Sequence, residues 1–418
     1  MQKAHFDHLL NTVLDSHEGI ADLFFIVGRP FQVEAFGKLK PVEVDPPVKN
    51  LTPFQVERIV NRLIGHDSRL VRDLVETGSC DSSYSVPGRC RLRVNIFRQR
   101  GNYGIVMRIL ATKIPTLEAL NLPTVFGKMT GEKTGLVLVT GATGSGKTTT
   151  LAALLNEFNE KLPGHIVTLE DPIEFVHPHK TSTFCQRELG NDFNTFATGL
   201  RAALREAPKV IFVGELRDRE TTEIAITAAE TGHLVVSTLH TINAGQSINR
   251  ILGMFEQAEQ TQMRQRLAET LRYIVAQRLA PKIGGGRQLV MEIMGSNLRT
   301  REAVLLGESE ERSFYDITVA SATYGWQTFD QSILASFKAG LIDEETALAY
   351  ASRKPIVLRG IDTHKHANGE GKTETSGLRM ANLTPEAPAA VPPPVPVGAP
   401  AQPAAPSLGS LQMTKPSR

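Results

Sequence analysis

Gly141-Ala-Thr-Gly-Ser-Gly-Lys147-Thr148 decides the fold, because this stretch matches the phosphate-loop pattern GxxxxGK[ST] in full. It follows directly on the apolar run LVLVT (136–140) and precedes apolar residues at helical spacing (Leu151, Leu154, Leu155). A strand, a glycine-rich turn and a helix in this order form a phosphate-binding unit. An accidental glycine-rich turn is the alternative, and the order of the elements disfavours it.

The loop predicts a site for ATP and Mg²⁺. Its glycines let successive backbone N–H groups point at phosphate oxygens. We expect Lys147 to bridge the β- and γ-phosphates and the Thr148 hydroxyl to bind Mg²⁺. The residues predicted to contact the nucleotide here are Gly141, Ala142, Thr143, Gly144, Ser145, Gly146, Lys147, Thr148 and Thr149.

Three further apolar runs follow, IVTLE (166–170), VIFVGE (210–215) and LVVSTLH (234–240), and helical segments separate them. Near-continuous apolar strands that alternate with helices indicate a parallel sheet covered on both faces. The predicted fold class is therefore α/β.

Acidic and histidine side chains stand where these strands end, and ligands bind at the carboxyl ends of parallel strands. Glu170, followed by Asp171, ends the first run, Glu215 the second and His240 the third. One carboxylate can hold Mg²⁺ in a Walker B role, and a second can orient or deprotonate water. The sequence leaves open whether Glu170 or Glu215 is the base. His233 and His240 bracket the last strand as candidates for sensing the γ-phosphate, although packed histidines are the competing interpretation.

Residues 1–112 are predicted to form a small α+β domain. Thr52 is expected to cap a helix with Pro53 at its first position, and a hairpin is expected from 89–97 and 105–109. Arg89, Arg91 and Arg93 would share one face of the first hairpin strand. A solvated strand face is the simpler interpretation, but Arg91 and Arg93 are also candidates for an arginine finger at a nucleotide.

The second predicted domain covers residues 113–360 and is expected to be helical from Ala258 to about Ser352, including a helix Met263–Leu279. A disordered tail is predicted for 361–418, because the last 38 residues hold ten of the 24 prolines.

Composition excludes several classes of protein. The 46 Lys and Arg residues nearly balance 44 Asp and Glu, so bulk charge favours neither nucleic-acid nor membrane binding, and no nucleic-acid partner is expected. Three cysteines without a CxxC pair argue against a disulfide framework and a four-cysteine zinc site. With no long apolar run and a polar N-terminus, we expect a soluble intracellular protein.

Four further motifs stand in order along the chain: LEDPIEF (169–175), LREAPKVIFVGELRD (204–218), ETGHLVVSTLHT (230–241) and WQTFDQSI (326–333). Together with the phosphate loop they resemble the PilT/PilU twitching-motility ATPases of the type II/IV secretion superfamily. The resemblance implies a PAS-like N-terminal domain and a RecA-like ATPase domain. It also implies a homohexamer on the cytoplasmic side of the inner membrane, where it would act on a platform protein and drive retraction of type IV pili.

The resemblance also assigns roles to residues. It places Glu170 in the general-base position of an acidic box that includes Asp171 and Glu174, and Glu215 in Walker B. His233 and His240 fall in the histidine box, and the region of Arg91 and Arg93 matches arginines that reach the nucleotide of a neighbouring subunit.

Some positions look more like PilU, namely GATG (141–144), QRELG (186–190) and Ala207-Pro208, whereas STLHT (237–241) looks more like PilT. An accessory PilU-like subunit that couples to a paralogous retraction ATPase is therefore an alternative to an autonomous retraction motor. A pilus-assembly or secretion ATPase is another, although those proteins usually carry a tetra-cysteine insert that this sequence lacks.

Overall fold

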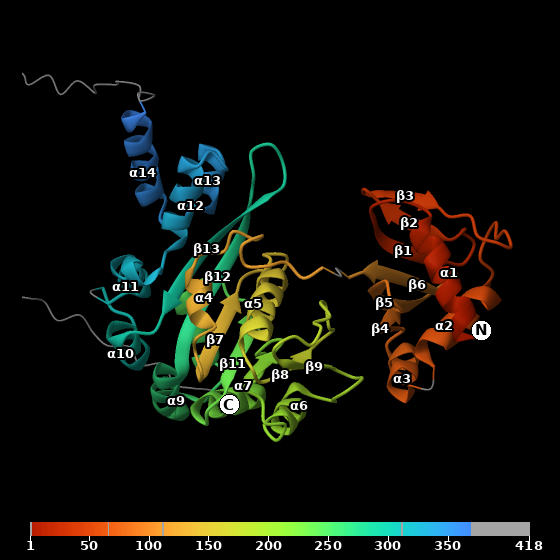
Figure 1. Cartoon of the computed structure of the whole chain (residues 1–418), viewed down its shortest axis with the longest axis horizontal. Helices are drawn as coiled ribbons and strands as arrows, with labels where there is room; N and C mark the ends of the chain where they lie inside the picture. The colour runs from red at the N-terminus through yellow and green to blue at the C-terminus, as the bar shows by residue number, and fades with distance from the viewer. Residues whose placement is uncertain (1, 66, 111–112, 311, 369–418) are drawn as a thin grey trace, which may run out of the picture.

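The computed structural model describes residues 2–65, 67–110, 113–310 and 312–368, and it contains two sheets, one in each of two domains (Figure 1). The first sheet ends at Ile109, and the predicted boundary at 112 falls outside the described residues. The boundary itself stays a prediction.

The N-terminal domain is a six-stranded antiparallel sheet in the order β3-β2-β1-β6-β5-β4, packed against three helices. Its elements are α1 (Lys3–Asp15), β1 (Ile20–Ile26), β2 (Gln32–Ala35), β3 (Lys38–Pro41), α2 (Pro53–Ile64), α3 (Ser68–Glu76), β4 (Ser79–Val86), β5 (Cys90–Gln99) and β6 (Asn102–Ile109).

Local sequence signals explain most of this domain. Thr52 caps α2 as predicted: its hydroxyl accepts from the Gln55 backbone N–H, and the Gln55 side chain accepts from the Thr52 N–H at 2.8 Å. The predicted hairpin is confirmed as β5 and β6. Strand β4 was not predicted, because SCDSSYSV (79–86) is mostly polar and buries only Cys80 and Val86.

The second domain contains a seven-stranded sheet in the order β13-β12-β7-β11-β10-β8-β9, parallel except for the edge strand β13. The elements from its start through the sheet are α4 (Val125–Met129), β7 (Gly135–Thr140), α5 (Lys147–Lys161), β8 (His165–Glu170), β9 (Thr183–Glu188), α6 (Phe196–Ala203), β10 (Val210–Val213), α7 (Arg219–Glu230), β11 (Leu234–Leu239), α8 (Ala244–Leu252), α9 (Gln257–Thr270), β12 (Leu271–Pro281) and β13 (Arg287–Gly295).

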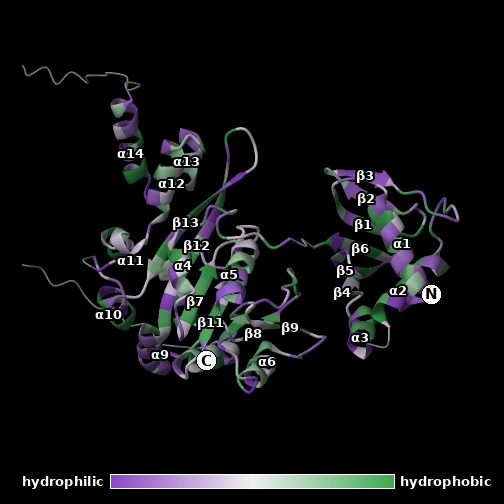
Figure 2. Cartoon of the chain, in the orientation of Figure 1, coloured by the Kyte–Doolittle hydropathy of each residue, from purple (hydrophilic) through white to green (hydrophobic). Residues whose placement is uncertain are grey.

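Helices cover both faces of this sheet, as the apolar strands predict. Along β7, Leu136 and Leu138 pack with α7, α8 and α9, whereas Val137 and Val139 point to the other face and pack with α4 and α5. Figure 2 shows the resulting concentration of apolar residues in the central strands. The predicted α/β fold class is confirmed.

The predicted helix Met263–Leu279 was wrong. Helix α9 ends at Thr270, and the chain continues as β12, which pairs with β7 on one side and β13 on the other. Ile274 and Val275 are both fully buried, on opposite faces of the sheet, whereas one amphipathic helix would bury a single stripe. The region from Ala258 to Ser352 is therefore interrupted by a long hairpin.

Helices follow the hairpin: α10 (Leu298–Leu306), α11 (Phe314–Ala320), the 3₁₀ turn Ala322–Tyr324, α12 (Phe329–Lys338), α13 (Glu344–Tyr350) and α14 (Lys354–Ala367). The predicted tail starts too early, because α14 continues past position 361 and buries Ile361. The rest of that predicted tail, from 369 to 418, lies outside the described residues. Within the described ranges, no helix is long and apolar enough to cross a membrane.

Candidate active site

The phosphate loop joins β7 to α5 and depends on glycine at two positions in particular. Gly141 has φ 147°, and a Cβ there would lie 2.5 Å from the Ser145 Oγ and 2.6 Å from the Gln277 carbonyl oxygen. Gly146, with φ 89°, is the left-handed N-cap of α5. The loop therefore packs closely on β12 and leads into the N-terminus of a 15-residue helix, which favours an anion.

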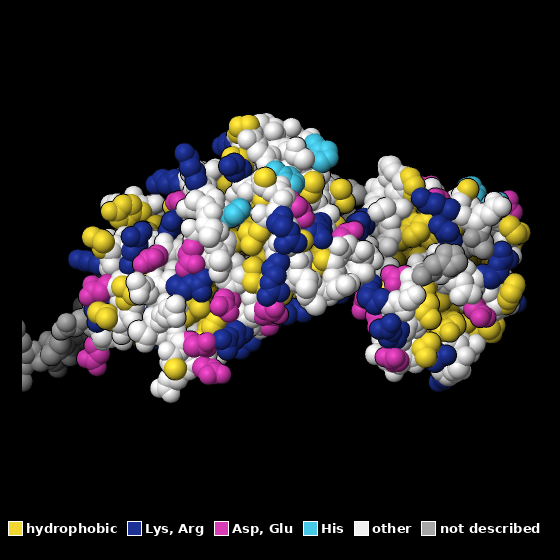
Figure 3. All heavy atoms as spheres, turned by 90° about the horizontal axis from the view of Figure 1, so that it is seen from below, with side chains coloured by type: hydrophobic (Ala, Val, Ile, Leu, Met, Phe, Trp, Pro, Cys, Tyr) yellow, Lys and Arg dark blue, Asp and Glu magenta, His cyan; other side chains and the backbone are white. Residues whose placement is uncertain are grey.

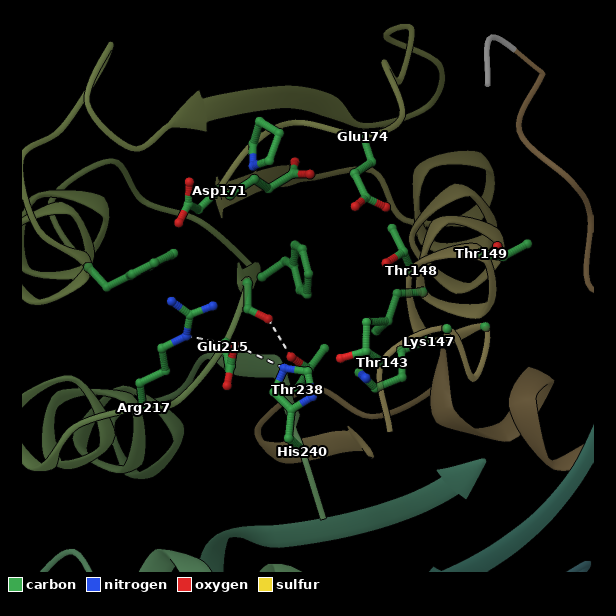
Figure 4. A pocket seen from close by; sticks show the side chains of 18 of the residues that line it. Thr143, Lys147, Thr148, Thr149, Asp171, Glu174, Glu215, Arg217, Thr238 and His240 are labelled. Atoms are coloured by element: carbon green, nitrogen blue, oxygen red, sulfur yellow. Dashed lines mark hydrogen bonds and ion pairs between the residues drawn. The ribbon is translucent and has the colours of Figure 1, made fainter. Parts of the chain in front are cut away.

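Two side chains at the start of α5 line a cavity of about 550 Å³ beside the loop (Figure 4). The Lys147 ammonium donates to the carbonyl oxygens of Gly141 at 2.7 Å and Ala142 at 3.0 Å. Burial lowers its pKa, while Glu215 and Glu174 act in the opposite direction. Thr148 is exposed, and its hydroxyl has no hydrogen-bond partner among the described residues.

Glu170 ends β8 and reaches the same cavity from a buried position. Its Oε1 accepts from the Thr168 hydroxyl at 2.6 Å and from the Gln186 amide at 2.9 Å. Burial raises the pKa of the Glu170 carboxyl to about 7, although these two hydrogen bonds act to lower it. A carboxyl with a pKa near neutrality is suited to accept a proton from water at physiological pH.

Glu215 and His240 lie next to each other in the lining of the same cavity (Figure 4). Glu215 follows β10, and its Oε2 accepts from the Arg217 Nε at 2.7 Å. The His240 Nε2 lies 3.4 Å from the same oxygen, at the end of β11. The site thus lies at the carboxyl ends of β8, β10 and β11, beside the loop that follows β7.

Comparison with known proteins places this site in a family. The model of the type II/IV secretion system proteins matches residues 85–309. The type IV pilus retraction ATPase PilT of Pseudomonas aeruginosa is 40% identical over 330 residues, which are 79% of this chain and 94% of PilT. The type IV pilus ATPase PilU of the same organism is 39% identical over 347 residues, 83% of this chain and 88% of PilU.

The chain belongs to the PilT/PilU family. The fold agrees, since the crystal structure of the pilus retraction motor PilT with bound ADP has a TM-score of 0.75 at 38% identity. That likeness covers 84% of this chain and 98% of the PilT chain. The resemblance inferred from the motifs is therefore confirmed, and the protein is a P-loop ATPase of the type II/IV secretion class.

The structure gathers most of the candidate site residues of this PilT/PilU family member in one place. Lys147, Thr148, Glu170, Glu215 and His240 all line the 550 Å³ cavity. Thr143 and Gly144 line this cavity and an adjoining one of about 320 Å³, whereas Gly141, Ala142 and Ser145 line the adjoining one alone.

Three candidates outside the phosphate loop do not reach this cavity. His233 immediately precedes β11, about 23 Å from His240 at 3.3 Å per strand residue, and its Nδ1 lies 3.1 Å from the Ala228 carbonyl oxygen. Arg91 pairs with Glu188 in the same chain. Arg93 lies in a neighbouring cleft of about 530 Å³ between the two domains.

Sequence reasoning missed two arginines that line the nucleotide cavity. Arg217 stands two residues after Glu215, inside the quoted motif GELRD, and could have been found there. Arg287 opens β13, and no signal pointed to it because that region was predicted to be helical.

A magnesium ion fits the oxygen donors present, since the Thr148 hydroxyl has no partner among the described residues and shares the cavity with Glu215. Across the described ranges, this cavity included, no group of three or more His, Cys, Asp or Glu side chains could hold a metal ion.

Proposed function

We propose that this protein is a hexameric ATPase motor that drives type IV pilus retraction. The observation that carries the proposal is the convergence of the phosphate loop, Glu170 and Glu215 on one cavity in a chain about 40% identical to PilT. We further propose that it works at the cytoplasmic face of the inner membrane, against a platform protein of the pilus machine. In this arrangement each subunit would complete its neighbour's site.

The residues of this chain divide the hydrolytic work. The loop amides and Lys147 bind the triphosphate, with the ammonium moving from the Gly141 carbonyl to a phosphate oxygen. Glu170 accepts the proton of a water whose oxygen attacks the γ-phosphorus, while the bond to the β-phosphate oxygen breaks and ADP leaves. Thr148 and Glu215 would hold Mg²⁺, which supplies charge neutralisation to the phosphates.

We assign the general base to Glu170 rather than to Glu215. Glu170 is buried, has a raised pKa and accepts only from neutral donors. Glu215 instead accepts from the Arg217 guanidinium, a permanent cation, and lies near His240. A carboxylate engaged with a guanidinium is better suited to a charge-organising role than to proton abstraction.

Among the N-domain arginines, we propose Arg93 as the one that reaches a nucleotide. Arg91 is tied to Glu188, whereas Arg93 is exposed and has no hydrogen-bond or ion-pair partner among the described residues. The cleft that it lines shares Asp171, Pro172 and Arg217 with the nucleotide cavity.

The pH dependence of hydrolysis tests the assignment of Glu170. Because a base must be ionised, kcat/KM for ATP is expected to fall as the pH drops through about 7, the pKa of Glu170. Thr168→Val removes a donor that stabilises the carboxylate, so its midpoint is expected to lie at higher pH than that of the wild type. If the midpoint is the same in both proteins, the titration belongs to another group, such as the substrate.

The motor function is tested first with the purified full-length protein, by phosphate release and by light scattering. We expect a hexamer that hydrolyses ATP without another protein. Deleting the gene in its host is then expected to abolish twitching while pili remain on the surface. The second candidate is an accessory PilU-like function, which the 39% identity to PilU supports. It would be favoured if the folded ring hydrolysed ATP negligibly and a paralogous ATPase restored the activity.

A further inference from the structure

Glu188 is a buried acid that the proposed chemistry does not use. It is the last residue of β9, the edge strand, and it pairs in register with Glu170 on β8. Its side chain is only 4% exposed, and it does not line the nucleotide cavity. A carboxylate in such a position requires several donors to offset the loss of water.

Donors from four segments supply that compensation. Oε1 accepts from the Ser83 hydroxyl at 2.7 Å and from the Asn191 amide at 2.6 Å. Oε2 accepts from the Ile173 backbone N–H at 3.1 Å and from the Arg91 guanidinium. Ser83 and Arg91 belong to β4 and β5 of the N-terminal domain, whereas Ile173 and Asn191 belong to the ATPase domain.

This carboxylate is the polar link between the two domains. Over the described part of the chain, every hydrogen bond and ion pair between the N-terminal and ATPase domains ends on Glu188. Figure 3 shows the domains as separate masses that meet over a narrow region. Arg91 also donates to the Ser83 hydroxyl at 2.6 Å, so the two N-domain donors form one unit.

The same carboxylate holds the loop that carries acids of the active site. Ile173 lies between Asp171 and Glu174, and both of these acids line the nucleotide cavity. Because one oxygen of Glu188 accepts from both Arg91 and Ile173, a displacement of Arg91 changes the anchor of this loop. The loop follows directly on Glu170, the residue assigned as base.

We propose that Glu188 is a positioning residue of the ATPase site: its carboxylate fastens Arg91 and Ser83 of the N-terminal domain to the loop 171–174, and so transmits N-domain movement to the acids that surround the nucleotide. The proposal rests on the proposed function of that cavity. Arg91 accordingly acts through Glu188 and not on a phosphate.

Three full-length variants test this coupling: Arg91→Gln, Glu188→Gln and the double variant. Each single change removes the same ion pair, so each is expected to lower kcat about tenfold while KM for ATP changes less than twofold. The double variant is expected to be no slower than the slower single variant, because the coupled interaction can be lost only once.

Amide hydrogen exchange supplies a readout that does not depend on turnover. In Arg91→Gln, faster exchange of the Ile173 amide is expected, although the substitution lies in the other domain. Arg201→Gln is the matched control. It breaks the 2.7 Å pair with Glu220 inside the ATPase domain, contacts neither Glu188 nor the nucleotide cavity, and is expected to leave both kcat and Ile173 exchange unchanged.

Two outcomes would overturn the proposal. If Arg91 acted directly on a phosphate, Arg91→Gln would be slow while Glu188→Gln kept or exceeded the wild-type rate. If the Ile173 amide exchanged at the wild-type rate in Arg91→Gln, the N-terminal domain would not be coupled to the loop 171–174. Either result leaves the proposed ATPase function standing, since that function is tested separately, by hydrolysis in the wild-type protein and its loss in Lys147→Ala.

Discussion

Lys147→Ala is expected to lower ATP hydrolysis by at least about a hundredfold, the scale of losing one electrostatic contact to a transferring phosphoryl group. The Lys147 ammonium donates to the carbonyl oxygens of Gly141 and Ala142, in the loop where the phosphates are proposed to bind. Its removal leaves no other lysine in the described lining of that cavity. Phosphate release at saturating ATP measures the effect.

Lys161→Ala is the matched control for this variant. Lys161 ends the same helix, α5, pairs with Glu157 on the surface and lies outside the cavity. Its variant is expected to keep the wild-type rate. Undiminished turnover in Lys147→Ala, with the control equally active, would remove the phosphate loop from the mechanism.

Glu170→Gln is expected to lower kcat by about 10²- to 10⁴-fold, the contribution of a positioned general base. Glutamine has nearly the same shape and keeps an oxygen for the Thr168 and Gln186 donors, but it does not accept the proton of the attacking water. Nucleotide affinity is therefore expected to change little. Single-turnover hydrolysis and equilibrium binding of ATP separate the two quantities.

Thermal unfolding distinguishes this chemical role from a structural one. The pKa of Glu170 in the folded protein, about 7, lies above the 4.5 that is usual for a glutamate, so the stability that the protonated carboxyl contributes is lost as the pH rises from about 4.5 through 7. At pH 8 the glutamine variant is expected to unfold at the same or a higher temperature than the wild type. The control Glu206→Gln, in a surface pair with Arg187, is expected to keep full activity. If Glu170→Gln had a low kcat and also unfolded at a lower temperature than the wild type, the loss of activity would indicate damaged packing.

The phosphate loop and its companion acids could be predicted because their chemistry imposes both residue type and place. Gly141 must lack a side chain to fit against Ser145 and Gln277, and Glu170 and Glu215 follow apolar strands whose ends must meet. In a parallel sheet the ligand site lies at the carboxyl ends of the strands, so predicting the strands also locates the site.

Other features depend on contacts between segments that are distant in the sequence. Strand β12 has two buried faces because β7 and β13 flank it. The spacing of Leu271, Ile274 and Val275 also suits a helix, so periodicity alone did not distinguish the two structures. Arg91 could not be assigned from its strand, because its partner Glu188 lies in the other domain. His233 was grouped with His240 by proximity in the sequence, yet a six-residue strand separates them.

The strand order of the ATPase sheet has a consequence for synthesis on the ribosome. Strand β7 is made early, but one of its two neighbours, β12, begins only at Leu271. The N-terminal sheet is closed by Ile109, so that domain can fold while the rest is still being translated. Until β12 emerges, the apolar edge of β7 remains open to other chains, and this interval is when the nascent protein is most exposed to aggregation.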